Sequence, residues 1–61
     1  GQEAAYRADL LTPAEVAARA DMTAARIVAL ARRGEIPARR VGSTWRFVPA
    51  EVARWLMQAW R

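Results

Sequence analysis

Five arginines lie within the seventeen residues ARRGEIPARRVGSTWRF, at positions 31–47. A guanidinium presents five N–H donors in a flat fork that fits phosphate or carboxylate oxygens two at a time. Every basic residue of the chain is arginine, which fits phosphate recognition and an arginine-favouring composition equally well. The residue types therefore predict binding of a polyanion, with a solvated basic surface as the alternative.

The charge of the chain is distributed unevenly. Residues 1–25 contain two arginines and four acidic residues, a net of −2, whereas residues 26–61 contain eight arginines and two glutamates, a net of +6. Such an asymmetry is typical of a chain whose basic half contacts a polyanion.

Enzymatic chemistry finds little support in the residue types present. The chain has no histidine and no cysteine, and its one serine is Ser43 in a predicted turn. Neither a metal cluster nor a nucleophile paired with a base can be assembled from these residues. The three glycines, Gly1, Gly34 and Gly42, form no glycine-rich phosphate loop. We expect a protein that is not an enzyme and that holds no metal or cofactor.

The length of 61 residues leaves room for one domain with one small core. No apolar run approaches the roughly 18 to 20 residues that span a bilayer, and no signal-type segment is present, so we expect a soluble cytoplasmic protein. Gly1 in place of Met is typical of a cleaved tag or an excised fragment. Residues 1–9 show no sustained period and are interpreted as a flexible tail, which leaves residues 10–61 as the domain.

A first helix is predicted over residues 13–20. Thr12 has the residue type of an N-cap, Pro13 suits the first helical position, and Glu15 at the third position completes a capping box. The apolar residues that share one face of this helix are Val16, Ala17 and Ala20.

A second helix is predicted over residues 24–33, capped by Thr23 and ended by Gly34. The three residues between the helices, of which Asp21 tolerates a turn conformation, give the spacing of a helix-turn-helix. The 3.6-residue period buries Ile27, Leu30 and Ala31 and leaves an outer face of Ala25, Arg26, Ala29, Arg32 and Arg33.

The period changes after the second helix. Residues 36–41 and 44–48 are short β-forming stretches, and Gly42 and Ser43 between them predict a hairpin with a tight turn. A third helix is predicted over residues 49–61, with an apolar stripe of Val52, Trp55, Leu56, Ala59 and Trp60. The order predicts a mainly α fold with a small β-hairpin, a winged helix-turn-helix.

The hairpin places its arginines by a two-residue period. If Val41 and Phe47 point inward, Arg40 and Arg46 both leave the opposite face, and Arg39 shares the parity of Val41. In a winged helix-turn-helix the second helix enters the major groove and the hairpin reaches the adjacent backbone or minor groove. The tryptophans of the hairpin and the last helix, Trp45 and Trp55, are expected in the core.

The run Leu10 to Leu56 resembles the excisionase-type DNA-binding domain, a small relative of the MerR winged-helix fold. The resemblance is carried by LLTPAEVA, RRGEIPARRVG, WRF and EVARWL in this order. It implies site-specific binding of double-stranded DNA, either as a recombination directionality factor that bends attachment-site DNA or as a small transcription regulator. The expected partner is double-stranded DNA. A recombinase is one further partner, and the alternative is a dimer or a cooperative array of this chain, because one small domain presents limited contact area.

The resemblance also implies individual roles. Arg26 takes the base-reading position, and phosphate contact is implied for Thr23, Arg32, Arg40 and Arg46. Ala25 stands where the family usually has a polar residue, and its methyl group suits a thymine methyl. Arg33 and Arg39 are expected to join these arginines along one strip of phosphates, and we call the whole set the arginine strip. Arg32 and Arg33 also suit the negative end of the helix dipole.

A second function class fits the same fold. The small apolar side chains of Ala25 and Ala29 suit helix packing, so a winged-helix protein-interaction or assembly module is the alternative to DNA binding. The arginine strip on the same side as the second helix favours DNA.

Overall fold

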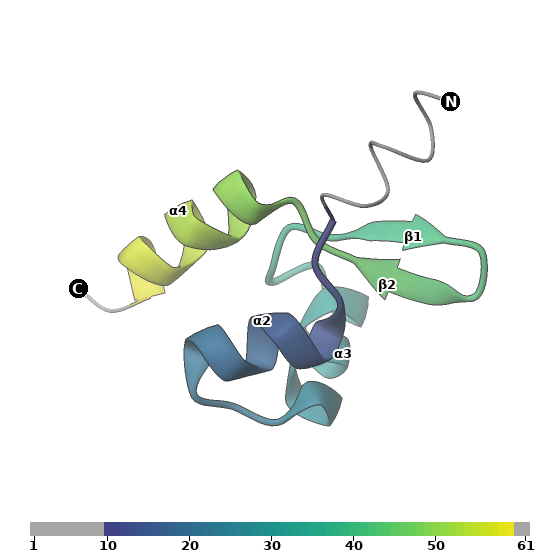
Figure 1. The fold of residues 1–61 in the computed structure, drawn as a ribbon, viewed down its shortest axis with the longest axis horizontal. Coiled ribbons are helices and arrows are strands. Elements are labelled where there is room, and N and C mark those ends of the chain that lie inside the picture. The colour runs from purple at the N-terminus through teal and green to yellow at the C-terminus, as the bar shows by residue number, and fades with distance from the viewer. Residues whose placement is uncertain (1–9, 60–61) are drawn as a thin grey trace.

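The computed structural model describes residues 10–59, so the predicted tail and Trp60 lie outside the described residues. The two helices α2 and α3 pack against each other, a hairpin extends to one side of them and α4 extends to the other (Figure 1). The elements are α2 (Pro13–Ala20), α3 (Ala24–Arg32), β1 (Arg39–Val41), β2 (Thr44–Arg46) and α4 (Pro49–Ala59). This order confirms the predicted fold class, three helices with a two-stranded antiparallel hairpin.

The start of α2 is fixed by a complete capping box. The Glu15 N–H donates to Thr12 Oγ1 at 3.2 Å, and the Thr12 N–H donates to Glu15 Oε1 at 2.9 Å. Two backbone donors at the helix start are thereby satisfied. The helix ends at Asp21, whose left-handed conformation (φ 57°, ψ 45°) is one that Asp tolerates better than most residues. The helix therefore has the bounds that the sequence predicts.

Replacement of the N-cap tests how much this box stabilises the fold. We expect Thr12→Ala to lower the free energy of unfolding by about 0.5 to 2 kcal/mol, because the Glu15 N–H loses its acceptor. Thermal or denaturant unfolding measures the change. Thr44→Ala, which removes an exposed hydroxyl that bonds the Val41 carbonyl in the hairpin, is a control of similar size outside the helix. An unfolding midpoint that stays at the wild-type value in Thr12→Ala contradicts a stabilising role for the box.

The capping box also makes stability depend on pH. Hydrogen bonds from the Thr12 backbone and side chain lower the pKa of Glu15 below its ordinary value of 4.5, and Arg19 and Arg46 add a smaller effect. A depressed folded-state pKa adds stability above the unfolded pKa, and this stability is lost as the pH falls through the folded pKa. We expect Glu15→Gln, which keeps a capping side chain, to lose less stability than wild type between neutral pH and acid below 4.5. Equal acid losses in the two proteins contradict this assignment.

The helix α3 begins at a cap and ends in a Schellman motif. Thr23 Oγ1 accepts from the Arg26 N–H at 3.2 Å, as the sequence predicts. At the other end the Glu35 N–H donates to the Leu30 carbonyl at 3.0 Å. Gly34 lies between them with φ 75°, a left-handed conformation that glycine adopts without a Cβ clash. These bonds end α3 at Arg32, one residue before the predicted end.

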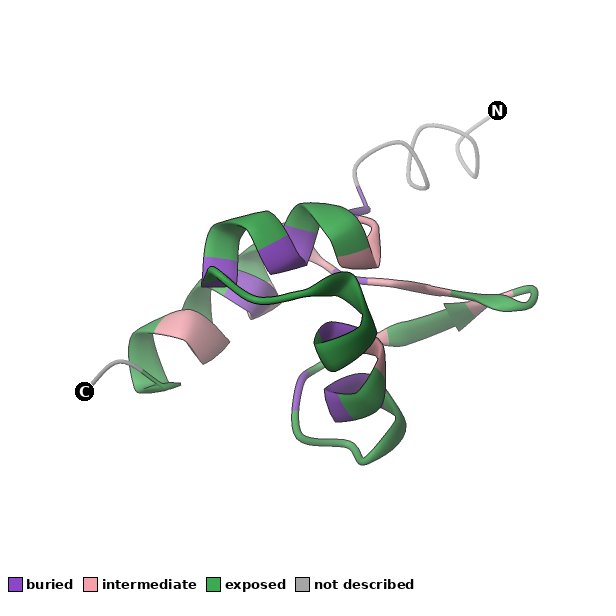
Figure 2. Ribbon diagram, turned by 90° about the horizontal axis from the view of Figure 1, so that it is seen from below, coloured by how far each residue is buried: buried purple, intermediate pink, exposed green. Residues whose placement is uncertain are grey.

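The core lies between α2, α3 and the start of α4, where the buried positions face one another (Figure 2). Phe47 is the largest fully buried side chain, and its backbone pairs with Leu11 through bonds of 2.8 and 3.0 Å. All six core residues predicted on the first two helices are buried, namely Val16, Ala17, Ala20, Ile27, Leu30 and Ala31. Ile36 in the loop after α3 is also buried.

The helix α4 contributes one fully buried residue to the core. Val52 is buried, whereas Trp55 and Leu56 are half-buried at the edge of the core, and Ala59 is exposed. Trp55 is therefore less buried than the sequence predicts, because the second half of α4 extends past the other two helices (Figure 1). Met57 on the outer face of α4 is 75% exposed.

Candidate nucleic-acid interface

The exposed face of α3 consists of small and cationic side chains. Ala25, Arg26, Ala29 and Arg32 are all exposed, and Val28 at the border is half-buried. Within the described residues neither Arg26 nor Arg32 has an acidic partner. Their donors are therefore available to an external acceptor, and the alanines between them let another surface approach the helix closely.

The first turn of α3 differs in charge from those of the other helices. The first turns of α2 and α4 contain Glu15 and Glu51, whereas that of α3 contains no acidic residue. The first backbone N–H groups of a helix have no partner inside it and carry the positive end of the helix dipole. Thr23 Oγ1 accepts the capping hydrogen bond through one lone pair, so its O–H group can still donate to another acceptor. This end of α3 suits a phosphate.

The arginines that flank the loop after α3 are held by glutamates. Arg33 Nε lies 2.6 Å from Glu35 Oε2, and Arg39 Nη2 lies 3.3 Å from Glu51 Oε2. Both pairs are exposed enough to be weak, so either guanidinium can exchange its partner at small cost. In this structure they are nevertheless engaged, which separates them from Arg26 and Arg32.

The hairpin does not direct its arginines as the sequence analysis expects. The two-residue loop pairs Val41 with Thr44, Arg40 with Trp45 and Arg39 with Arg46. Directly opposed residues share a face of the ladder, so Arg40 and Arg46 leave opposite faces.

The expectation that Val41 and Phe47 share the inner face is therefore wrong. In this register Val41 shares a face of the hairpin with Thr44. Phe47 lies two residues after Trp45 and therefore shares the opposite face with Trp45. The loop is fixed by Gly42, whose φ of 62° at its first position fits a type II′ turn.

Trp45 contacts two of the three arginines of the wing, the hairpin formed by β1 and β2. The Arg40 guanidinium carbon lies 5.0 Å from the centre of the Trp45 ring, within cation–π range. On the other face Arg46 Nη1 donates to the Trp45 carbonyl at 2.8 Å. Trp45 itself is half-buried and packs on the core, so the core placement expected from the sequence holds only for part of its surface.

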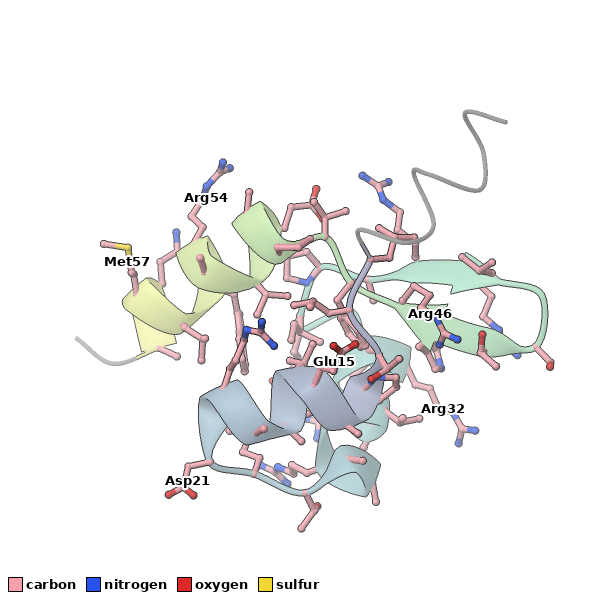
Figure 3. All side chains as sticks on the ribbon, in the orientation of Figure 1. Glu15, Asp21, Arg32, Arg46, Arg54 and Met57 are labelled. Atoms are coloured by element: carbon pink, nitrogen blue, oxygen red, sulfur yellow. The ribbon has the colours of Figure 1, made fainter. Side chains whose placement is uncertain are left out.

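Arginines lie at both ends of the molecule (Figure 3). Arg32 and Arg46 project on the side of the hairpin, whereas Arg54 projects from α4 at the opposite end (Figure 3). Arg54 is exposed and forms no ion pair within residues 10–59, which makes it a natural control for the loss of one positive charge. No group of three metal-ligating side chains occurs in the same described range.

The two ion pairs in this region were not predicted from the sequence. The Arg33–Glu35 pair has a local signal, opposite charges two residues apart around a helix-ending glycine. The Arg39–Glu51 pair spans twelve residues and two elements, so only the folded chain brings it together.

None of the described helices is long and apolar enough to cross a membrane.

A tight pair of helices, a basic hairpin and a closing helix form the arrangement of a small winged helix-turn-helix. The chain belongs to the helix-turn-helix domain family, which matches residues 10–59. Searches of curated proteins and of solved structures found no match.

Proposed function

We propose that this protein binds double-stranded DNA in a sequence-specific manner, with α3 in the major groove. The single observation that carries the proposal is the exposed face of α3, where Arg26 and Arg32 have no acidic partner within the described residues. Arg26 lies in the first turn, the part of a recognition helix that reaches base edges. A guanidinium there fits the two acceptors of a guanine. The methyl group of Ala25 offers an apolar contact to thymine.

The remaining contacts are assigned to phosphates. Thr23 and the start of α3 suit one phosphate by their O–H and N–H donors. Arg32 at the end of α3 and the wing arginines, Arg40 and Arg46, grip the backbone beside the groove. Arg33 and Arg39 join them by exchanging their glutamate partners for phosphates.

The biological role we propose is that of an excisionase-type recombination directionality factor or a small transcription regulator, related to the MerR winged-helix proteins. One small domain presents limited contact area, so tight specific binding is expected to need a dimer or a cooperative array. A recombinase is the further partner that the first role requires. Both roles depend on sequence-specific DNA binding, which is the step to test first.

Selection of bound duplexes from a random pool tests the proposal. We expect a short recurring sequence that contains guanine, and, if copies bind together, two such sequences about 10 to 10.5 base pairs apart. The Arg54→Ala variant should select the same sequence, because Arg54 lies at the opposite end of the molecule (Figure 3). A pool that returns with its composition unchanged contradicts sequence-specific binding.

The alternative is a winged-helix module that binds another protein. The exposed alanines on α3 and the 75% exposed Met57 on α4 are the observations that favour it. If the protein binds no duplex above an inert basic control, this function takes the place of DNA binding.

A further inference from the structure

We infer that Trp45 is a positioning residue for DNA contact, because its ring holds the Arg40 guanidinium in the orientation that a phosphate requires. The inference rests on the proposed DNA-binding function. It assigns to the half-buried tryptophan of the wing a part in binding as well as in packing.

The geometry of the pair carries the first step. Arg40 and Trp45 are directly opposed on the antiparallel ladder, so their side chains leave the same face as close neighbours. The Arg40 guanidinium carbon lies 5.0 Å from the centre of the indole ring. Trp45 also packs against the hydrophobic core, so the surface on which the guanidinium rests is tied to the body of the domain.

Stacking leaves the donors of the guanidinium free. A guanidinium stacks through its flat face, whereas its N–H groups point outward in the plane of the fork. Arg40 is exposed and forms no ion pair within residues 10–59, unlike Arg39 beside it, which is held by Glu51. The stacked group can therefore donate to phosphate oxygens without first breaking a contact.

Stacking also lowers the entropy lost on binding. A free arginine side chain samples many rotamers, and fixing them opposes binding. The Trp45 ring fixes part of the Arg40 side chain before DNA arrives. Loss of the ring should therefore weaken duplex binding by about two- to fivefold, the range expected for a cation–π contact at an exposed site.

A second arginine of the wing, Arg46, provides an internal comparison. Arg46 leaves the opposite face of the ladder and donates to the Trp45 backbone carbonyl at 2.8 Å. A substitution of the Trp45 side chain leaves this carbonyl in place. The Trp45 side chain should therefore be coupled to Arg40 and independent of Arg46.

A double-mutant cycle tests the inference, with labelled duplex and wild type, Trp45→Leu, Arg40→Ala and the double variant. Leucine keeps an apolar side chain on the core and removes the π face. We expect Trp45→Leu to weaken binding in wild type and to have little effect once Arg40 is alanine. A parallel cycle with Arg46→Ala should be additive. Equal effects of Trp45→Leu with and without Arg40 overturn the inference.

Two controls separate positioning from structural damage. Trp55→Leu removes another half-buried indole at the edge of the same core, and no arginine stacks on Trp55 within the described residues. It should leave duplex affinity within twofold of wild type. Trp45→Phe retains a smaller π face and should bind between wild type and Trp45→Leu, which keeps the test valid if the leucine variant is unstable.

A spectroscopic measurement reports the stack without DNA. The proton on Arg40 Nε should resonate upfield of an ordinary arginine, because the indole ring current shields it, and should return toward the ordinary position in Trp45→Leu. An ordinary shift in wild type overturns the inference. If wild type binds duplex and Arg40→Ala weakens it while the cycle is additive, only the positioning role fails. If wild type binds no duplex, the proposed function fails and the inference fails with it.

Discussion

Phe47→Ala is expected to leave most of the domain unfolded at room temperature. Phe47 is the largest fully buried side chain, and it belongs to the core cluster that residues of α2, α3 and α4 form. Truncation of a buried phenylalanine costs about 3 to 5 kcal/mol, from lost burial and the cavity that remains. A core in a domain below about 70 residues supplies little more than this amount. The remaining Leu11 ladder bonds cannot compensate, because they involve the backbone alone.

Denaturant unfolding followed by far-ultraviolet circular dichroism measures the effect. The matched comparison is Trp55→Ala, a larger truncation at a half-buried position. The sequence alone predicts a cost of about 3 to 5 kcal/mol for Trp55, and partial exposure reduces our expectation to about 1 to 3 kcal/mol. If Trp55→Ala destabilises the domain more than Phe47→Ala, the centre of the core lies along α4 and our description of it is wrong.

Arg26→Ala is expected to reduce the preference for a selected duplex over a random one. Loss of an arginine that reads a guanine costs about 1 to 3 kcal/mol on the preferred site and relaxes preference at one base pair. Arg26 is exposed and has no acidic partner within the described residues, so little of this loss reflects destabilisation of the fold. Its backbone N–H, which bonds the Thr23 hydroxyl, is retained in the variant.

The wing arginines are expected to behave differently. Arg40→Ala and Arg46→Ala should weaken preferred and random duplexes alike, and each should lower the slope of log affinity against log salt by about one unit. Titrations of both duplexes at several salt concentrations measure preference and slope together. If the wing variants change the sequence preference while Arg26→Ala changes only overall affinity, the assignments of groove and wing are inverted.

Much of this fold is predictable because its signals are local. Thr12 and Glu15 predict a helix start, and Gly34 predicts a helix end, because each of these residues acts on backbone groups within one turn. The register of the hairpin follows from the two-residue loop at Gly42. Pairs counted outward from that loop place Val41 and Phe47 on opposite faces, contrary to the expectation that both point inward.

The features that the sequence did not predict depend on contacts between distant elements. Ile36 stands between Glu35 and Pro37 in the loop after α3, so no helical period marks it as buried. Trp55 sits on a correct apolar stripe, but burial requires a covering element, and α4 extends beyond the others. The engagement of Arg39 by Glu51 likewise joins the hairpin to α4 and forms only in the folded chain.

If the face formed by α3 and the wing binds DNA as we propose, affinity depends on the positions of its arginines as well as on their charge. Titration of one labelled duplex at low and moderate salt tests it, with the double variants Arg26→Ala/Arg32→Ala and Arg26→Ala/Arg54→Ala compared. Both variants lose two positive charges, but only the first loses both arginines of α3, neither of which has an acidic partner within residues 10–59. We predict that the first variant has the lower affinity for the duplex, because it also loses the phosphate contact that we assign to Arg32. Equal affinities at both salt concentrations would contradict the claim, because binding would then depend on net charge alone.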